Sequence, residues 1–216
     1  MRYDADMRPL KPASGWPIAD VAAKLDAPID DEARAALGVW LDALAEWNAK
    51  MDLTAAKDAR ALAWLMLADA LVLADAIARG ASVVDVGSGA GAPGLPLAIL
   101  RGDLRVTLCE PLGKRAAFLR SVIGALIPKR TIALEAKRGE DLAKRAFDVA
   151  ISRATLAPPE WLALGSALVR DGGHVWLMLA QEEPPALEGC TIERTIAYDD
   201  DATSAKKKLV SYRVTR

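Results

Sequence analysis

Apolar side chains recur at helical spacing through the first part of the chain. Between residues 33 and 51 they return every three or four positions, which predicts one amphipathic helix. Asp30 or Asp31, directly before this stripe, can cap the first turn of that helix. Residues 59–78 are apolar nearly all round and predict a second, buried helix with Gly80 as its stop. A buried helix needs a larger body to pack against, so both helices are expected to cover one.

The segment before these helices has a different pattern. Four prolines interrupt residues 1–29 and leave room for at most one short helix, near residues 19–25. We therefore expect an irregular N-terminal arm over residues 1–29 and a helical cap over residues 30–80.

From residue 81 onward, short apolar runs alternate with helical segments. The expected strands are residues 81–86, 105–109, 131–134, 148–152 and 174–179. The expected helices are residues 93–100, 114–126, 140–146 and 159–170. This alternation predicts an α/β fold, a Rossmann-like doubly wound parallel sheet over residues 81–216. Two further strands, residues 190–197 and 208–214, are expected to end the sheet as a hairpin.

Composition excludes several classes of protein. The chain has 216 residues, of which 52% are hydrophobic, so it can bury a large core and is not disordered throughout. Two cysteines, Cys109 and Cys190, are too few for a disulfide framework or a zinc cluster. With a single histidine, His174, a histidine-rich metal site is excluded as well, and we expect no metal.

No membrane segment is expected. The longest apolar run, residues 61–77, contains two aspartates and is shorter than the roughly 20 residues that span a bilayer. The N-terminus shows no apolar segment of the kind that secretory signals carry. We therefore expect a soluble, cytoplasmic protein.

Charge is distributed unevenly along the chain. The formal net charge is −1, but residues 101–154 hold 12 Lys and Arg against 6 Asp and Glu. A polyanion would therefore find one basic segment, although a solvated surface would have the same composition.

A glycine-rich loop follows the first expected strand, at the edge where open α/β sheets bind their ligands. Gly87, Gly89 and Gly91 allow a tight turn and a close approach of a ligand to the backbone. Gly87 and Gly89, with Glu110 about 20 residues later, also fit a dinucleotide-binding loop, so an NAD-type oxidoreductase is one alternative.

Two acidic residues favour a different ligand. Asp85 lies two residues before the first glycine, where it would repel a pyrophosphate but attract the ammonium group of S-adenosylmethionine (AdoMet). Glu110, at the end of the second strand, can accept hydrogen bonds from both ribose hydroxyls. An acid, three alternating glycines and an acid after the next strand are the pattern of class I AdoMet-dependent methyltransferases.

The flanking sequence sharpens this resemblance. The matching segments around the loop are residues 85–91, 93–99, 112–115 and 118–120. Further matches are residues 47–48, 53–54, 138–141, 147–148 and 152–154. From about residue 30 to its end, the chain strongly resembles the RsmG (GidB) family, bacterial small-subunit ribosomal RNA guanine-N7 methyltransferases. The resemblance implies AdoMet as cofactor and ribosomal RNA or the small ribosomal subunit as partner. We expect no obligate protein partner and a monomer.

The resemblance also implies which residues form the site. The cofactor-binding residues would be Gly87, Ser88, Gly89, Ala90, Gly91, Glu110, Gly139 and Glu140, to which the charge argument adds Asp85. Arg153 matches the family's arginine near the transfer site and is the candidate catalytic and RNA-binding residue. Lys114, Arg115 and Arg120 are candidate phosphate-binding residues, although exposed helix cations often have no such role.

The chain departs from the family pattern on the expected substrate side. The departures are Asp52, Met66, Ala70, Leu179 and Ala180, while Asp69 and Gln181 are retained. They leave two alternatives open: a diverged methyltransferase with another substrate, and an inactive RNA-binding relative. The absence of an obvious catalytic histidine or cysteine is compatible with transfer to guanine N7, because its free lone pair attacks a methyl group without a strong base.

Overall fold

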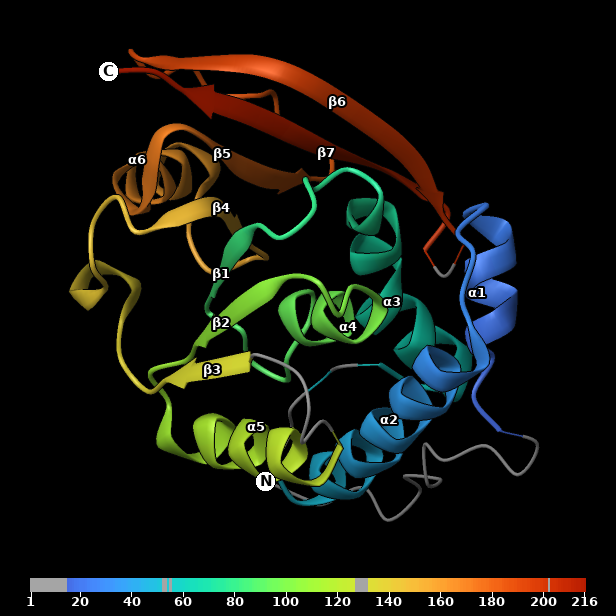
Figure 1. Cartoon of the computed structure of the whole chain (residues 1–216). Helices are drawn as coiled ribbons and strands as arrows, with labels where there is room; N and C mark the ends of the chain where they lie inside the picture. Colours follow the sequence, from blue (N-terminus) through green and yellow to red (C-terminus); the bar gives the residue numbers. More distant parts are fainter. Residues whose placement is uncertain (1–14, 52–53, 55, 127–131, 202) are drawn as a thin grey trace, which may run out of the picture.

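The computed structural model describes residues 15–51, 54, 56–126, 132–201 and 203–216. It contains one seven-stranded sheet with helices on both faces (Figure 1). The strands are β1 (Ser82–Val86), β2 (Arg105–Cys109), β3 (Ile132–Glu135), β4 (Phe147–Ser152), β5 (Val169–Leu179), β6 (Cys190–Asp200) and β7 (Ala205–Val214). The helices are α1 (Ile18–Lys24), α2 (Asp31–Met51), α3 (Ala59–Ala74), α4 (Gly94–Leu100), α5 (Gly113–Leu126) and α6 (Pro158–Leu168), with a short 3₁₀ helix η1 (Gly139–Asp141).

The order of the strands places the ligand-binding edge. The sheet runs β3-β2-β1-β4-β5-β7-β6, and β1 to β5 are parallel to one another. The chain builds outward from β1 to β3 and then returns to place β4 on the other side of β1. This reversal between β1 and β4 is a switch point, where α/β sheets bind ligands beyond the carboxyl ends of the strands. The expected doubly wound sheet is therefore confirmed.

The capping aspartates start the helices of the N-terminal part. Asp30 accepts the backbone N–H of Ala33 at 2.7 Å, and Asp58 accepts that of Ala61 at 2.8 Å, so α2 and α3 begin as expected. The short helix expected near residues 19–25 is α1. The first 14 residues of the expected arm lie outside the described part of the chain.

The end of α3 differs from the expected one. The helix stops at Ala74, four residues before the expected end at residue 78. The guanidinium of Arg101 donates to the carbonyls of Ala74 and Ile77, and Asp103 holds it in place through two hydrogen bonds of 2.7 and 2.8 Å. Because a side chain far along the sequence satisfies these carbonyls, the helix needs no glycine cap to stop.

Two hydrophobic clusters cover the two faces of the sheet. One cluster joins buried side chains of α1 to α5 with one face, for example Leu41 of α2 with Val83 of β1. The other joins α6 with the opposite face, for example Trp161 with Val84 of β1. The helices expected to form a cap thus share a core with the sheet, and Figure 1 shows α1, α2 and α3 packed along one side of it.

The connection between β3 and β4 is less helical than expected. In place of a helix over residues 140–146, only η1 forms. Arg145 has a left-handed φ of +55°, and the N–H groups of Arg145 and Ala146 donate to the carbonyls of Ala167 and Leu168 near the end of α6. These tertiary hydrogen bonds replace the ones that a local helix would make, so the prediction of a helix here was wrong.

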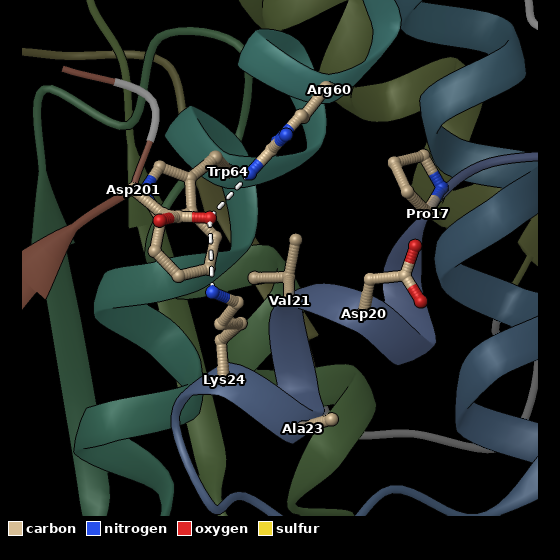
Figure 2. Close-up of a pocket in the computed structure, with 8 residues that line it drawn as sticks. All are labelled: Pro17, Asp20, Val21, Ala23, Lys24, Arg60, Trp64 and Asp201. Carbon is tan, nitrogen blue, oxygen red and sulfur yellow. Dashed lines mark hydrogen bonds and ion pairs between the residues drawn. The ribbon is translucent and has the colours of Figure 1, made fainter. Parts of the chain in front are cut away.

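The C-terminal hairpin is longer than expected. Strands β6 and β7 pair antiparallel over their whole length, with β6 at the edge of the sheet, and β5 begins at Val169, five residues before the predicted start. Past the end of β6, Asp201 forms ion pairs with Arg60 of α3 (2.5 Å) and Lys24 of α1 (3.7 Å). Figure 2 shows these ion pairs in the lining of a pocket of about 480 Å³, which Trp64 also lines. The hairpin is therefore attached to the N-terminal helices.

We expect the N-terminal helices and the sheet to unfold together, because they share one hydrophobic cluster. Leu41→Ala removes a fully buried side chain of α2 and should lower the free energy of unfolding by about 2–5 kcal/mol. Val39→Ala, on the exposed side of the same helix, should change it by less than about 0.5 kcal/mol. Urea unfolding followed by circular dichroism and by tryptophan fluorescence measures both. Two separate transitions would contradict the shared core.

Candidate functional site

The glycine loop lies at the end of β1, at the switch point of the sheet. Gly87, Gly89 and Gly91 have φ values of +74°, +56° and +111°, which side-chain-bearing residues rarely adopt. A Cβ atom at Gly87 would lie 2.1 Å from Oγ1 of Thr155. The backbone of the loop thus favours glycine at all three positions, and most strongly at Gly87, where Thr155 leaves no room for a side chain.

Glu110 closes the loop from the neighbouring strand. It follows β2 directly, is 2% exposed, and its Oε2 accepts the backbone N–H of Gly89 at 2.8 Å. Its Oε1 accepts the N–H of Leu112 at 2.8 Å. A carboxylate has about four lone-pair positions, so each oxygen can accept one more hydrogen bond. Two acceptors side by side suit a pair of neighbouring hydroxyls, such as those of a ribose.

Ser88 links the loop to both strands. Its hydroxyl donates to the carbonyl of Asp85 at 2.9 Å and accepts the N–H of Cys109 at 3.1 Å. The backbone N–H groups of Gly87 and Ser88 donate to the carbonyl of Cys109. Ser88 is 2% exposed, so its hydroxyl holds the loop between β1 and β2.

Asp85 is fully buried on the α4 side of β1. Its Oδ2 accepts the N–H of Gly94, the first residue of α4, at 3.0 Å. Its Oδ1 is buried and has no hydrogen-bond partner among the described residues. Burial raises the pKa of Asp85 from 3.8 to about 7, and the hydrogen bond from Gly94 and the charge of Arg153 partly offset that rise. A buried acceptor without a partner beside the loop fits a ligand with a cationic N–H group.

Gly139 and Glu140 belong to η1, and Gly139 lies on the same side of the sheet as α6. A Cβ atom at Gly139 would lie 2.7 Å from Cγ1 of Val86, so η1 packs closely against the end of β1. Gly139 is buried and Glu140 is exposed. The structure therefore brings this pair near the glycine loop.

Arg153 follows β4 directly, beside the loop. Its Nη1 donates to the carbonyl of Leu65 in α3 and lies 3.4 Å from Oδ2 of Asp69. The next residue, Ala154, has a left-handed φ of +53°, an uncommon conformation for a residue other than glycine. That turn returns the chain toward β1, where the hydroxyl of Thr155 donates to the carbonyl of Val86 at 3.2 Å.

The candidate RNA-binding cations lie on α5, which starts three residues after Glu110. Lys114 and Arg120 are exposed and Arg115 is half-buried. Phe118 of the same helix is buried and packs against Trp47 of α2, with ring centroids 5.4 Å apart. The apolar side of α5 thus faces the core and leaves the two exposed cations toward solvent.

Three further residues, which no candidate motif contained as site residues, hold the site together. Trp40 of α2 is fully buried and donates from its indole nitrogen to the carbonyl of Ala90 at 3.2 Å. Ser152 donates to the carbonyl of Val86 at 2.8 Å, and Thr155 packs against Gly87. Ser152 stands within a segment that carried the family resemblance, which was the available signal for it. No sequence signal was available for Trp40, because 50 residues separate it from its partner.

Most of the residues that depart from the family pattern are not on an open substrate surface. Met66, Ala70 and Leu179 are buried among hydrophobic side chains. Ala180 is exposed, and Asp52 lies outside the described residues. The three buried residues therefore contribute to the hydrophobic packing, and Met66 and Ala70 do so on α3, the helix whose Asp69 contacts Arg153.

Family comparison decides between the alternative ligands of the loop. The family model for rRNA small subunit methyltransferase G matches residues 34–206, most of the chain. The chain belongs to this family. The predicted class I methyltransferase is therefore confirmed, its cofactor is AdoMet, and the NAD-type alternative is not supported.

Individual relatives agree with this assignment. A ribosomal RNA small subunit methyltransferase G from Anaeromyxobacter dehalogenans is 34% identical over 90% of this chain and 95% of its own length. The protein of that name from Xanthomonas oryzae pv. oryzae is also 34% identical, over 90% of this chain and 95% of its own. Among solved structures, the M. jannaschii TYW2 protein in complex with AdoMet has a TM-score of 0.54 and 17% identity. It covers 68% of this chain and 74% of its own, and it supports the fold alone.

The buried carboxyl of Asp85 predicts a pH-dependent stability. An unfolded aspartate ionises near pH 3.8 but Asp85 in the folded chain near pH 7, so the folded state binds more protons between these values and stability falls as pH rises. The difference of about three pKa units corresponds to on the order of 4 kcal/mol. Asp85→Asn should therefore flatten the fall in unfolding free energy between about pH 5 and about pH 7, measured by urea titration.

Asp103→Asn is the matched control for this prediction. The hydrogen bond from Arg101 holds the pKa of Asp103 below its usual range, so its contribution is lost only at lower pH. This variant should lower stability equally at about pH 5 and about pH 7. A slope that changes in Asp103→Asn but not in Asp85→Asn would contradict the assignment to Asp85.

Proposed function

We propose that the chain transfers a methyl group from AdoMet to guanine N7 of small-subunit ribosomal RNA. The observation that carries the proposal is the position of Glu110, whose two oxygens accept N–H groups of the glycine loop and of the entrance to α5. Each oxygen keeps a lone pair for a ribose hydroxyl. The family named for rRNA small subunit methyltransferase G supplies the substrate class.

Asp85 and the loop would bind the methionine end of AdoMet. The unpartnered Oδ1 of Asp85 can accept from the ammonium group, and three glycines keep the backbone open to a close approach. An ionised Asp85 favours a cationic ligand, so AdoMet affinity falls as the pH drops below about 7. Gly139 and Glu140 would flank the adenine, as in the family.

Arg153 and the cations of α5 would bind the RNA. Arg153 lies beside the loop, where its remaining N–H groups can orient the target base through O6, an acceptor that guanine offers to arginine. Lys114, Arg115 and Arg120 lie on the helix that starts beside Glu110 and can bind phosphates. The proposal thus places the cofactor and the RNA at one edge of the sheet.

The chemistry requires little from the protein's side chains. When bound, AdoMet would supply an activated methyl group to the lone pair of guanine N7, with the bond between sulfur and the methyl carbon breaking and S-adenosylhomocysteine leaving. The task of the chain is to align the two reactants and exclude competing groups. Cys109 is not a competing nucleophile, because burial raises the pKa of its thiol to about 12 and its Sγ donates to the carbonyl of Lys137.

We further propose a monomer that works in the cytoplasm, where ribosomal subunits are available. None of the described helices is long and apolar enough to cross a membrane. We propose three parts of the chain: an N-terminal arm over residues 1–29, a helical cap over residues 30–80 and a methyltransferase core over residues 81–216.

Glu110→Gln tests the cofactor site. The amide nitrogen replaces one acceptor oxygen, so AdoMet should bind roughly 10- to 100-fold more weakly, because hydrogen bonds to a charged acceptor are lost. Titration calorimetry with AdoMet measures the affinity. Glu135→Gln, one strand away at the same edge of the sheet, should leave the affinity unchanged. Equal affinities for both variants would contradict the role of Glu110.

Transfer to RNA is tested with small ribosomal subunits from a strain that lacks this protein. Incubation with radiolabelled AdoMet should label the small-subunit RNA, and mapping of the modified nucleotide should find 7-methylguanine. Label in another base or another RNA would indicate a diverged substrate. Bound RNA without label would indicate an inactive RNA-binding relative.

The triple variant Lys114→Ala, Arg115→Ala, Arg120→Ala tests the RNA surface. Each lost phosphate contact should reduce the slope of log affinity against log salt by about 0.7–0.9, so RNA affinity becomes less salt-dependent. AdoMet affinity should not change. The control variant Arg213→Ala, on β7 beside His174 of β5, should keep the original slope. An unchanged slope in the triple variant would exclude these residues as phosphate contacts.

A further inference from the structure

A chain of three polar side chains links the proposed catalytic arginine to the C-terminal hairpin. Nη1 of Arg153 donates to the carbonyl of Leu65 and lies 3.4 Å from Oδ2 of Asp69. The other oxygen of Asp69, Oδ1, accepts the hydroxyl of Tyr198 at 2.5 Å. The three side chains come from the end of β4, from α3 and from β6, so no local sequence signal connects them.

We propose that Asp69 and Tyr198 are positioning residues that set where the guanidinium of Arg153 lies during methyl transfer. The inference rests on the proposed role of Arg153 and goes beyond it, because neither residue belongs to the cofactor loop or to the basic face of α5. Tyr198 donates to one oxygen of Asp69 and Arg153 lies at the other, so the two donors share the charge of one carboxylate. The tyrosine thereby limits how strongly the carboxylate attracts the guanidinium toward α3.

The surroundings shield this arrangement from water. The side chain of Asp69 is 4% exposed and that of Arg153 is 21% exposed, so little water competes for either. Burial and the neighbouring carboxylate of Asp69 raise the pKa of Tyr198 well above its usual range. Tyr198 therefore stays a hydrogen-bond donor at every pH at which the protein is folded, and a carboxylate with two donors has a defined orientation.

Tyr198 does not depend on its hydroxyl for its position. The hairpin is attached to the helices separately, through the ion pairs of Asp201 with Arg60 and Lys24 (Figure 2). The ring of Tyr198 also packs against the hydrophobic cluster that α3 shares with the sheet. Removal of the hydroxyl alone should therefore change the partners of Asp69 and leave the hairpin in place.

The position of Arg153 has a second readout on the cofactor side. Its charge lowers the pKa of Asp85, whereas burial and the charge of Glu110 raise it. The neighbouring Cys109 stays protonated and adds no charge. If the guanidinium is displaced away from Asp85, the pH midpoint of AdoMet affinity should rise. This readout needs no RNA.

The decisive variant is Tyr198→Phe, which removes one oxygen atom. The carboxylate of Asp69 then loses its second donor and should bind the guanidinium of Arg153 more tightly, which displaces the guanidinium. We expect kcat for methylation of small subunits to fall about fivefold to tenfold, the effect of one displaced hydrogen-bonding group, with KM for subunits within about twofold. The pH midpoint of AdoMet affinity should rise. Asp69→Asn removes the attraction, so it should also lower kcat but shift the midpoint downward.

Two control variants separate positioning from stability. Tyr212→Phe removes a hydroxyl from the same hairpin, where it donates to the carbonyl of Pro185 at 2.7 Å. Asp201→Asn weakens the attachment of the hairpin to α1 and α3 without contact to Asp69. Both should keep the wild-type kcat and the wild-type pH midpoint, even where their melting temperatures fall.

The double variant Tyr198→Phe, Arg153→Ala completes the test. If Tyr198 acts through Arg153, the double variant should have the kcat of Arg153→Ala alone. A further fall in kcat, or a Tyr198→Phe variant that matches Tyr212→Phe in both kcat and pH midpoint, would overturn the inference. If the wild type methylates no subunit, the proposed function fails, and the pH midpoints alone then support or overturn the positioning of Arg153.

Discussion

The site depends on two buried carboxylates that hold one loop from opposite sides. Glu110 accepts the N–H of Gly89 within the loop, and Asp85 accepts the N–H of Gly94 where the loop enters α4. Burial of a carboxylate is unfavourable unless hydrogen bonds or charges compensate it. The pKa of Asp85 stays raised because its hydrogen bonds and neighbouring charges offset only part of the effect of burial. In the proposed site a cationic cofactor would supply the missing compensation and stabilise the loop.

The N-terminal helices contribute to the site as well as to the core. Trp40 of α2 donates to the carbonyl of Ala90 in the glycine loop, and α3 offers the carbonyl of Leu65 and the carboxylate of Asp69 to Arg153. Because these helices share a hydrophobic cluster with the sheet, they cannot shift without the loop and the arginine shifting as well. Their packing therefore affects the reaction geometry directly.

The sequence predicted the parts of the site that neighbouring residues determine. The glycine loop, Glu110 and the two strands before them follow from patterns within about 30 residues, and the structure brings them together. The sequence did not predict the contact between Asp69 and Tyr198, because 129 residues separate them. Neither residue stands out from the pattern of its own helix or strand. The helix expected over residues 140–146 failed for the same reason, since hydrogen bonds to the end of α6 override local preference there.

Contacts between residues close in sequence and contacts between residues far apart hold different parts of the site. Backbone N–H groups and nearby carboxylates hold the cofactor side, and any chain with this loop can rebuild them. The arginine on the substrate side is oriented by side chains from α3 and β6, which can vary independently of the loop. Met66 and Ala70 flank Asp69 on α3, yet both are buried in the hydrophobic cluster, while Asp69 itself retains its contact with Arg153. Departures from the family pattern at these two positions therefore change the packing around Asp69 and leave the polar partner of Arg153 in place.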